Sequence, residues 1–320
     1  MKQYIPVLFV VALLAGCHSS PKGVPVVGFV DAFEDNTIAQ AKNGFVDALK
    51  KNGLDEQKGT VKILYRNAQG NIPTLTQIVK YFISEKVTAL ATSPSLSTIT
   101  AIQNTKTIPI FMMVSPTPAL MKVTNAEGAA PANLLGVAED LGYIDTSFLL
   151  IPRFINPKAG RMKVGMIFNQ SEPQSVEATE RIGKLAAANN IELVSLPINT
   201  SADVQLITAT LLSKGVDAFF ANPDNTVFAS FETIVKSCNK ANVPVFTSEA
   251  GLVARGALAA YGADIYQWGY QAGEQAAKYL QAADKAGFKW EMVTVRKRVY
   301  NAAAARNFHI TMPANFEAIQ

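Results

Sequence analysis

The sequence has few of the side chains on which most enzymes rely. Histidine occurs at two positions, His18 and His309, which lie near the ends of the chain. This scarcity excludes most schemes in which imidazole acts as an acid, a base or a metal ligand. The sequence also lacks a G-x-S-x-G elbow, a P-loop, a G-x-G-x-x-G fingerprint and an H-E-x-x-H motif. We therefore predict a protein that is not an enzyme and that needs no cofactor or metal ion; a hydrolase that uses carboxylates alone is the alternative.

Cysteine is equally scarce, occurring at Cys17 and Cys238. Cys17 closes the run Leu14-Ala15-Gly16-Cys17, directly after the apolar stretch Ile5–Ala15. This run resembles the lipobox of bacterial lipoproteins, which implies a signal peptide at residues 1–16, lipid attachment at Cys17 and a tether at residues 17–25. An ordinary signal peptide is the alternative. Because a lipidated Cys17 cannot form a disulfide, we expect Cys238, on the apolar stripe of a helix, to be a buried and inert thiol.

Charge is sparse and dispersed. Charged residues make up 17% of the chain and hydrophobic residues 49%, which favours folded cores over disorder. The densest positive cluster, Arg296 to Arg298, is too short to indicate a nucleic-acid-binding surface, although the formal net charge is +4. The length of 320 residues exceeds the ~250–300 at which single cores stop growing, so we expect two domains.

Strands and helices alternate along the chain, and the pattern occurs twice. Val87–Leu90 is echoed by Val216–Phe219, and Ile108–Phe111 is echoed by Val243–Phe246. We predict an α/β fold of two Rossmann-like parallel-sheet lobes joined by a hinge. The N-terminal lobe would comprise residues 26–137 plus about 266–290, and the C-terminal lobe residues 138–265 plus about 291–320.

Three segments are predicted in more detail. Val243–Tyr266 is typical of a strand, a turn and a second strand. Tyr143–Phe154 is expected to form one helix, and another single helix is expected to bury Val227, Phe231 and Cys238 along one face.

Polar side chains gather where the predicted strands end. Ligands of open α/β sheets bind beyond the carboxyl ends of the strands, so these residues are candidate ligand contacts. They are Thr92, Ser93, Ser115, Asn169, Ser171, Glu172, Asp224, Asn225, Ser248, Glu249 and Asp264. Helix N-termini beside them can hold an anionic group, and a carboxylate such as Asp264 can hold a cationic one. For each residue, a role as a helix cap or turn former is the alternative.

From Val26 to about Tyr300 the sequence resembles the ABC transporter substrate-binding lipoproteins of the tryptophan/tyrosine-binding type. Tyr65–Gly70 is similar to the family's Y-x-N-A-Q-G, and Asn169–Ser175 to its N-P-S-E-x-x-S. Pro223–Thr226 is similar to P-T-D-N-T, and Arg255–Asp264 to R-G-A-L-A-A-x-G-x-D-Y-Y. The resemblance implies a type I periplasmic-binding fold that closes on a ligand and delivers it to a membrane permease powered by a separate ATPase.

The resemblance also implies which residues hold the ligand. Thr92 and Ser93 match a small hydroxyl loop, and Glu34 matches an acidic residue after the first strand. The matches in the second lobe are Asn169, Ser171, Glu172, Asp224, Asn225 and Asp264. Two segments depart from the family: residues 30–36 keep only Glu34 of T-Q-x-x-E-H-P, and Ser115–Ala119 replaces T-D-P-V-G. The neighbouring Phe29, Phe33, Met112 and Met113 favour a bulkier, more apolar ligand.

We therefore expect a membrane-anchored solute-binding protein of an ABC-type transport system, on the periplasmic side of the cell envelope. Its ligand would be a small molecule similar to an aromatic or branched amino acid. The expected partners are this ligand, an ABC permease or another membrane transport component, and the membrane through Cys17; we expect a monomer that does not bind nucleic acid. A carrier of a hydrophobic or lipid ligand, and a sensor without transport, are the alternatives.

Overall fold

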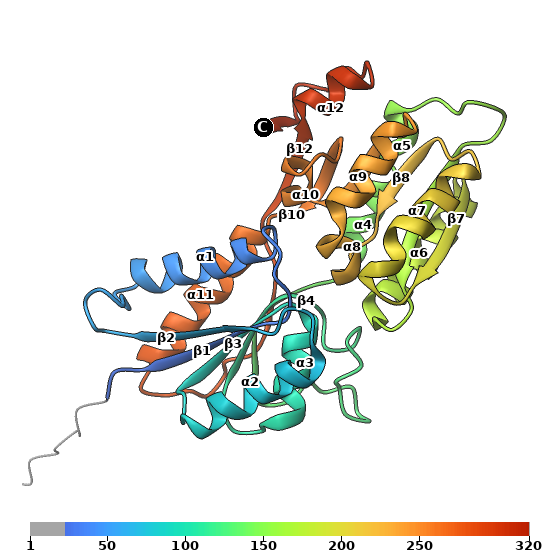
Figure 1. The fold of residues 1–320 in the computed structure, drawn as a ribbon. Helices are drawn as coiled ribbons and strands as arrows, with labels where there is room; N and C mark the ends of the chain where they lie inside the picture. Colours follow the sequence, from blue (N-terminus) through green and yellow to red (C-terminus); the bar gives the residue numbers. More distant parts are fainter. Residues whose placement is uncertain (1–22, 320) are drawn as a thin grey trace, which may run out of the picture.

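The computed structural model describes residues 23–319, so the predicted signal peptide, Cys17 and most of the tether lie outside the described residues. The described chain forms two lobes, each built on one sheet with helices packed against its faces (Figure 1). The first sheet has the order β11-β5-β4-β3-β1-β2, and the second has the order β13-β12-β10-β9-β8-β6-β7. The prediction of two α/β lobes with parallel sheets is confirmed.

The first lobe contains a fully parallel sheet. Its strands are β1 (Val26–Asp31), β2 (Lys62–Asn67), β3 (Ala89–Ser93), β4 (Ile110–Pro116), β5 (Leu134–Glu139) and β11 (Glu291–Met292). Its helices are α1 (Ala39–Lys51), α2 (Ile72–Ser84), α3 (Ser95–Asn104) and α11 (Ile265–Gln281). Helices α1 and α11 pack against each other on one face of the sheet, and α2 and α3 cover the other face (Figure 1).

The second lobe contains a sheet that is parallel except where β12 pairs with β10. Its strands are β6 (Lys163–Asn169), β7 (Glu192–Ile198), β8 (Ala218–Ala221), β9 (Val245–Glu249), β10 (Ala259–Ala263), β12 (Arg296–Asn301) and β13 (Glu317–Ile319). Its helices are α4 (Gly142–Phe148), α5 (Ile151–Phe154), α6 (Pro173–Ala188), the 3-10 helix η1 (Ser201–Asp203), α7 (Val204–Ser213), α8 (Asn225–Ala229), α9 (Phe231–Lys240), α10 (Ala250–Ala254) and α12 (Ala302–Asn307).

The two sheets repeat one strand order. The order β2-β1-β3-β4-β5 in the first lobe corresponds to β7-β6-β8-β9-β10 in the second. The echoed sequences therefore lead into equivalent strands, β3 with β8 and β4 with β9. In this arrangement the strand order reverses between β1 and β3, and between β6 and β8. Ligands bind at such switch points, beyond the carboxyl ends of the strands.

Local sequence explains where several elements begin and end. The Asn71 side chain accepts a hydrogen bond from Thr74 N and caps α2. Pro173 begins α6, at a position where a missing N–H costs little. Gly53, at φ 82°, takes the left-handed conformation that follows the end of α1. Cys238 lies fully buried on α9, so its predicted burial is confirmed, and burial raises the pKa of its thiol to about 12.

Three details of the sequence-based prediction are wrong. Strands β9 and β10 are joined by the short helix α10 rather than a turn, because they are parallel and parallel strands need a crossover connection. The helix expected over Tyr143–Phe154 is divided into α4 and α5, since Pro152 has no N–H to continue the hydrogen-bond ladder. The helix expected after Asn225 is divided into α8 and α9 at Ser230.

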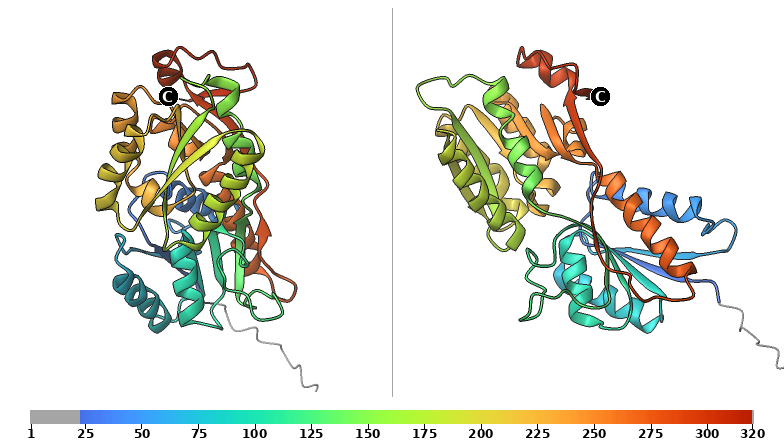
Figure 2. Two further views of the ribbon diagram at one scale, coloured as in Figure 1. Left: turned by 90° about the vertical axis from the view of Figure 1, so that its right-hand side faces the viewer. Right: turned by 180° about the vertical axis from the view of Figure 1, so that it is seen from behind.

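Three segments carry the chain between the lobes. They lie between β5 and α4, between β10 and α11, and between β11 and β12. Figure 2, right, shows the last of these running from the first lobe into the second. Arg296 Nη2 lies 2.5 Å from Glu139 Oε1, and Lys297 Nζ lies 2.8 Å from Asp264 Oδ2. The third crossover is therefore tied to both of the others by ion pairs, and we call these three segments the hinge.

The loop between β1 and α1 also reaches the second lobe. Ile38 is buried in the apolar cluster of that lobe. Asp35 Oδ2 accepts a hydrogen bond of 2.6 Å from Arg255 Nη1, and Thr37 Oγ1 lies 3.1 Å from the same nitrogen. We call the Asp35–Arg255 contact the interlobe ion pair.

Within residues 23–319, none of the helices is long and apolar enough to cross a membrane.

Candidate functional site

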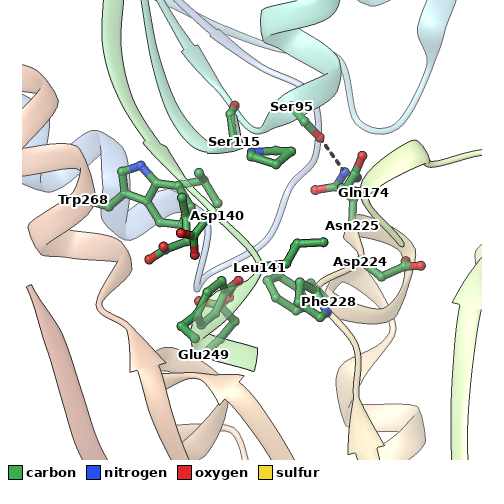
Figure 3. Close-up of a pocket in the computed structure, with 15 residues that line it drawn as sticks. Ser95, Ser115, Asp140, Leu141, Gln174, Asp224, Asn225, Phe228, Glu249 and Trp268 are labelled. Atoms are coloured by element: carbon green, nitrogen blue, oxygen red, sulfur yellow. Dashed lines mark hydrogen bonds between the residues drawn. The ribbon is translucent and has the colours of Figure 1, made fainter. Parts of the chain in front are cut away.

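Two neighbouring hollows lie between the carboxyl ends of the two sheets. The outer groove has a volume of about 900 Å³ and the inner pocket about 50 Å³. The inner pocket is lined by Ser95, Val114, Ser115, Pro116, Glu139, Asp140, Leu141, Tyr143, Gln174, Pro223, Asp224, Asn225, Phe228, Glu249 and Trp268 (Figure 3). The outer groove is lined by Phe33, Glu34, Gln69, Gly70, Ile72, Leu96, Ile99, Thr100, Gln103, Asn169, Ser171, Glu172, Asn199, Thr200, Ser201, Thr226 and Ala229.

Most of the predicted site residues line one of these hollows, and their role in binding stays a prediction. Ser115, Asp224, Asn225 and Glu249 line the inner pocket. Glu34, Asn169, Ser171 and Glu172 line the outer groove. Thr92, Ser93, Ser248 and Asp264 line neither.

Asp264 belongs to the hinge instead. Its Oδ1 accepts a hydrogen bond from Gln267 N and so caps α11, while Oδ2 pairs with Lys297. This geometry favours the helix-cap alternative for Asp264. The Thr92 hydroxyl also has a partner within the protein, because it forms a hydrogen bond of 2.9 Å with the Thr98 hydroxyl. The Thr98 hydroxyl in turn lies 3.1 Å from Ser115 Oγ, so the three hydroxyls form a row of hydrogen bonds.

Glu172 is the centre of a buried polar network beside the outer groove. Its Oε1 accepts hydrogen bonds from Asn169 Nδ2 and Thr226 Oγ1. Its Oε2 accepts from Gln174 Nε2 at 2.6 Å, and from both the backbone N and the Nδ2 of Asn225. The side chain is held rigidly by these donors. Burial, with a smaller contribution from the nearby Asp224 carboxyl, nevertheless raises the pKa of the Glu172 carboxyl to about 8.

Asp224 joins this network from the start of α8. Its Oδ2 accepts hydrogen bonds of 2.6 Å from Asn169 N and Ser175 Oγ, and its Oδ1 accepts one from Val227 N. Burial raises the pKa of Asp224 as well, although these donors act in the opposite direction. Asn225 Nδ2 also lies 3.4 Å from Ser95 Oγ, and this contact crosses the cleft between the two lobes (Figure 3).

Glu249 and Glu139 lie on the hinge side of the inner pocket. Tyr143 Oη donates a 2.8 Å hydrogen bond to Glu249 Oε1. Burial raises the pKa of Glu249 to about 8. Burial also raises the pKa of Glu139 to about 7, against the lowering effect of Arg296. The inner pocket is thus bordered by carboxyl groups held in a poorly hydrated environment.

The walls of the outer groove differ in polarity. The first lobe supplies the large apolar side chains Phe33, Ile72, Leu96 and Ile99, and Ile72 is 48% exposed. It also supplies the polar side chains Glu34, Gln69, Thr100 and Gln103. The second lobe supplies amides, hydroxyls and Glu172. This arrangement suits a ligand that has an apolar body and a polar end.

Sequence reasoning missed several lining residues because they lie within helices rather than at strand ends. Ser95 and Gln174 stand in the first turns of α3 and α6, and Phe228 stands in α8. Trp268 lies one turn into α11, where its indole Nε1 donates to Val137 O. Their position in the sequence could have identified them, because the first turn of a helix that follows a parallel strand faces the same edge of the sheet.

Among the described residues, no group of three His, Cys, Asp or Glu side chains is arranged to hold a metal ion.

Comparisons with known proteins agree with this architecture. A family model described as ABC transporter substrate binding protein matches residues 25–319. A protein of Clostridioides difficile (strain R20291) named Tyrosine-binding protein is 31% identical over 255 residues, which is 80% of this chain and 72% of that protein.

Two solved structures have the same fold. One is a conserved domain protein from Vibrio cholerae O1 biovar El Tor, with a TM-score of 0.82 and 27% identity over 93% of this chain and 100% of that chain. The other is an ABC domain from Streptococcus pneumoniae in complex with L-Trp, with a TM-score of 0.81 and 19% identity over 92% of this chain and 99% of that chain.

Proposed function

Because the chain belongs to the family of ABC transporter substrate-binding proteins, we propose that it captures an amino acid-like small molecule between its lobes and delivers it to a membrane permease. The observation that carries the proposal is that polar side chains of both lobes line the same cleft, with Asn225 and Ser95 in contact across it. Membership of this family also makes the protein a binding protein rather than an enzyme.

The choice of ligand rests on the relatives and on the groove. One relative is named for tyrosine, and one structure of the same fold holds L-Trp. The apolar wall formed by Phe33, Leu96 and Ile99 can pack on an aromatic or branched side chain, while the second lobe offers hydrogen bonds. Binding favours the closed arrangement of the lobes only by as much as the ligand contacts that arrangement better than the open one.

A calorimetric screen with aromatic and branched amino acids, and with the amines derived from them, tests this function. We expect binding of at least one compound, together with a smaller radius of gyration in X-ray scattering. The variant Glu180→Gln serves as a control, because Glu180 is exposed on α6 outside both hollows. If none of these compounds binds, the proposed ligand class is refuted.

A hydrophobic or lipid ligand is the second candidate. The exposed Ile72 and the neighbouring Phe33 and Leu96 favour it, since they extend the apolar wall toward solvent. Native mass spectrometry of freshly purified protein would detect a co-purified hydrophobic molecule, and its consistent absence would argue against this candidate.

We also propose that the protein is a lipoprotein on the periplasmic side of the cell envelope, anchored through Cys17. We propose lobe boundaries close to those predicted from the sequence, with the first lobe extended to the ends of β5 and β11. The run Leu14–Cys17 supports this anchor. Replacing Cys17 by Ser is expected to move the protein from the membrane fraction to the soluble fraction and to abolish incorporation of labelled palmitate. Retention of the variant in the membrane fraction would contradict the anchor.

A further inference from the structure

The cleft has acidic side chains but no basic ones. Glu139, Asp140, Asp224 and Glu249 line the inner pocket, and Glu34 and Glu172 line the outer groove. The residues that line the two hollows include no lysine, arginine or histidine. Arg296 approaches the inner pocket from the hinge. Its Nη2 pairs with Glu139 at 2.5 Å and its guanidinium lies over the Tyr143 ring, while its Nε has no hydrogen-bond partner among the described residues. Burial raises the pKa of most of these carboxyl groups, so a cationic ligand beside them would favour their ionised form, whereas an anionic ligand would oppose it.

Two of these carboxyl groups, Glu139 and Glu249, have an oxygen without a hydrogen-bond partner within residues 23–319. Glu249 is 2% exposed and lines the inner pocket, and its Oε1 is fixed by the hydrogen bond from Tyr143. Within residues 23–319, its Oε2 has no hydrogen-bond partner. A buried acceptor without a donor is costly, and such groups call for an occupant that supplies one.

Aromatic rings line the same pocket. Tyr143, Phe228 and Trp268 all border it, and Figure 3 shows Trp268 beside Asp140 and Phe228 beside Leu141. Aromatic rings attract cations through their quadrupoles, and carboxylates attract them by charge. The hydrogen bond from Trp268 Nε1 to Val137 O holds the indole in place. The volume of about 50 Å³ suits a head group rather than a whole amino acid.

The places where a ligand carboxylate could bind have few free hydrogen-bond donors and no basic side chains. At the start of α8, Asn225 N already donates to Glu172 Oε2, and Val227 N donates to Asp224 Oδ1. The start of α3 has no side-chain cap, but no basic side chain among those that line the cleft assists it. A carboxylate placed there would also oppose ionisation of the surrounding acidic groups.

We propose that the inner pocket is a subsite for an organic ammonium group, formed by Glu249, Asp140, Tyr143 and Trp268, and that the preferred ligand is an amine with an apolar body and no carboxylate. This inference rests on the proposed function and narrows its ligand class. An organic cation fits better than a metal ion, since no group of carboxylates in the described part of the chain has the arrangement of a metal site. The apolar body would lie in the outer groove against Phe33, Leu96 and Ile99.

Matched pairs of compounds test the inference. Isothermal titration calorimetry at pH 7.5 would compare tyramine with tyrosine, tryptamine with tryptophan, and isopentylamine with leucine. We expect the amine to bind at least tenfold more tightly than its amino acid in at least one pair. Tighter binding of the amino acid in each pair that binds would overturn the inference and leave the proposed function standing. Binding of none of the compounds would overturn both.

Variants locate the subsite. Glu249→Gln is expected to weaken amine binding at least tenfold and to change amino acid binding less. An amino acid loses the same attraction for its ammonium group, but repulsion of its carboxylate by Glu249 is relieved at the same time. Glu180→Gln, on the exposed face of α6, serves as the charge-matched control and should bind like the wild type. Equal amine affinity in Glu249→Gln and the wild type, with both variants folded by circular dichroism, would refute the assignment of the subsite to Glu249.

Discussion

The carboxyl group of Glu249 couples the stability of the protein to pH. Its pKa is raised to about 8, chiefly by burial; Glu139 acts in the same direction, and Tyr143 and Arg296 act against it. In the unfolded chain the pKa returns to about 4.3. Between these values the folded state binds more protons than the unfolded state, so the free energy of unfolding falls as pH rises from about 4.5 to about 8. The glutamine variant should show a shallower fall over this range, measured by urea denaturation.

The comparison needs a control, because other buried acids contribute to the same trend. The pKa values of Asp31 and Glu139 are raised to about 7, so a residual slope is expected in Glu249→Gln. Glu180→Gln should keep the slope of the wild type, since Glu180 is exposed. Identical slopes in the wild type and Glu249→Gln would show that Glu249 titrates normally in the folded protein.

A second residue-scale prediction concerns the ion pair between Arg296 and Glu139. Glu139 is 2% exposed, so removal of its partner leaves a buried carboxylate without compensation. Arg296→Met should lower the free energy of unfolding by about 3 kcal/mol at pH 8. The loss should be smaller at pH 5, where Glu139 is protonated because its pKa is raised to about 7. The double variant Glu139→Gln/Arg296→Met should recover most of the stability, and a loss as large as that of the single variant would contradict this account.

At the scale of elements, the contact between α1 and α11 depends on glycine. A Cβ atom at Gly269 would lie 1.9 Å from Ala41 O, and one at Gly44 would lie 2.0 Å from Tyr266 O. Gly269→Ala should therefore force the helices apart and cost about 1–3 kcal/mol or more. Gly183→Ala is the control, because no atom beyond its chain neighbours and the adjacent backbone of α6 lies within 4 Å of its Cβ position, and α6 should gain about 0.5–1 kcal/mol. Thermal unfolding that shifts equally in both variants would contradict close packing at Gly269.

The order and type of most elements could be predicted from the sequence, whereas their connections could not. Apolar runs bounded by polar loops identified the strands, and the echo of Ile108–Phe111 in Val243–Phe246 identified the equivalent strands β4 and β9. The division into α8 and α9 was missed because Phe228 and Phe231 are both buried, so the apolar stripe continues through the break. Helix α10 was missed because its five residues are too few for a helical period.

The candidate site was predicted only in part, for a similar reason. Strand ends are visible in the sequence, and they identified Glu172, Asp224 and Glu249. The sequence does not show which partner a carboxylate meets across long separations. Asp264 pairs with Lys297, and Glu139 pairs with Arg296; both basic residues begin β12, directly after another crossover of the hinge. Side chains within helices, such as Trp268, carry no strand-end signal at all.

At the scale of the whole molecule, the interlobe ion pair links the first lobe to the second outside the hinge. Arg255 lies between α10 and β10 and contacts two carboxylates: Asp35 from the first lobe at 2.6 Å, and Glu232 from its own lobe at 2.8 Å. Asp35 is 1% exposed in its side chain, so solvent screens this contact little. The pair favours the arrangement of the lobes described here over arrangements in which they lie further apart.

Two matched variants separate these contacts. Asp35→Asn retains the Oδ1 atom that accepts from Thr37 N and Ile38 N, but loses the charge that attracts Arg255. We expect a shift of about 1 kcal/mol toward open arrangements, roughly a fivefold change in their population. X-ray scattering should then give a larger radius of gyration without ligand, and ligand affinity should fall, because the closed state is less populated. Glu232→Gln removes the contact within one lobe only and should leave the scattering curve unchanged. If both variants scatter like the wild type, the interlobe ion pair does not set the balance between open and closed lobes.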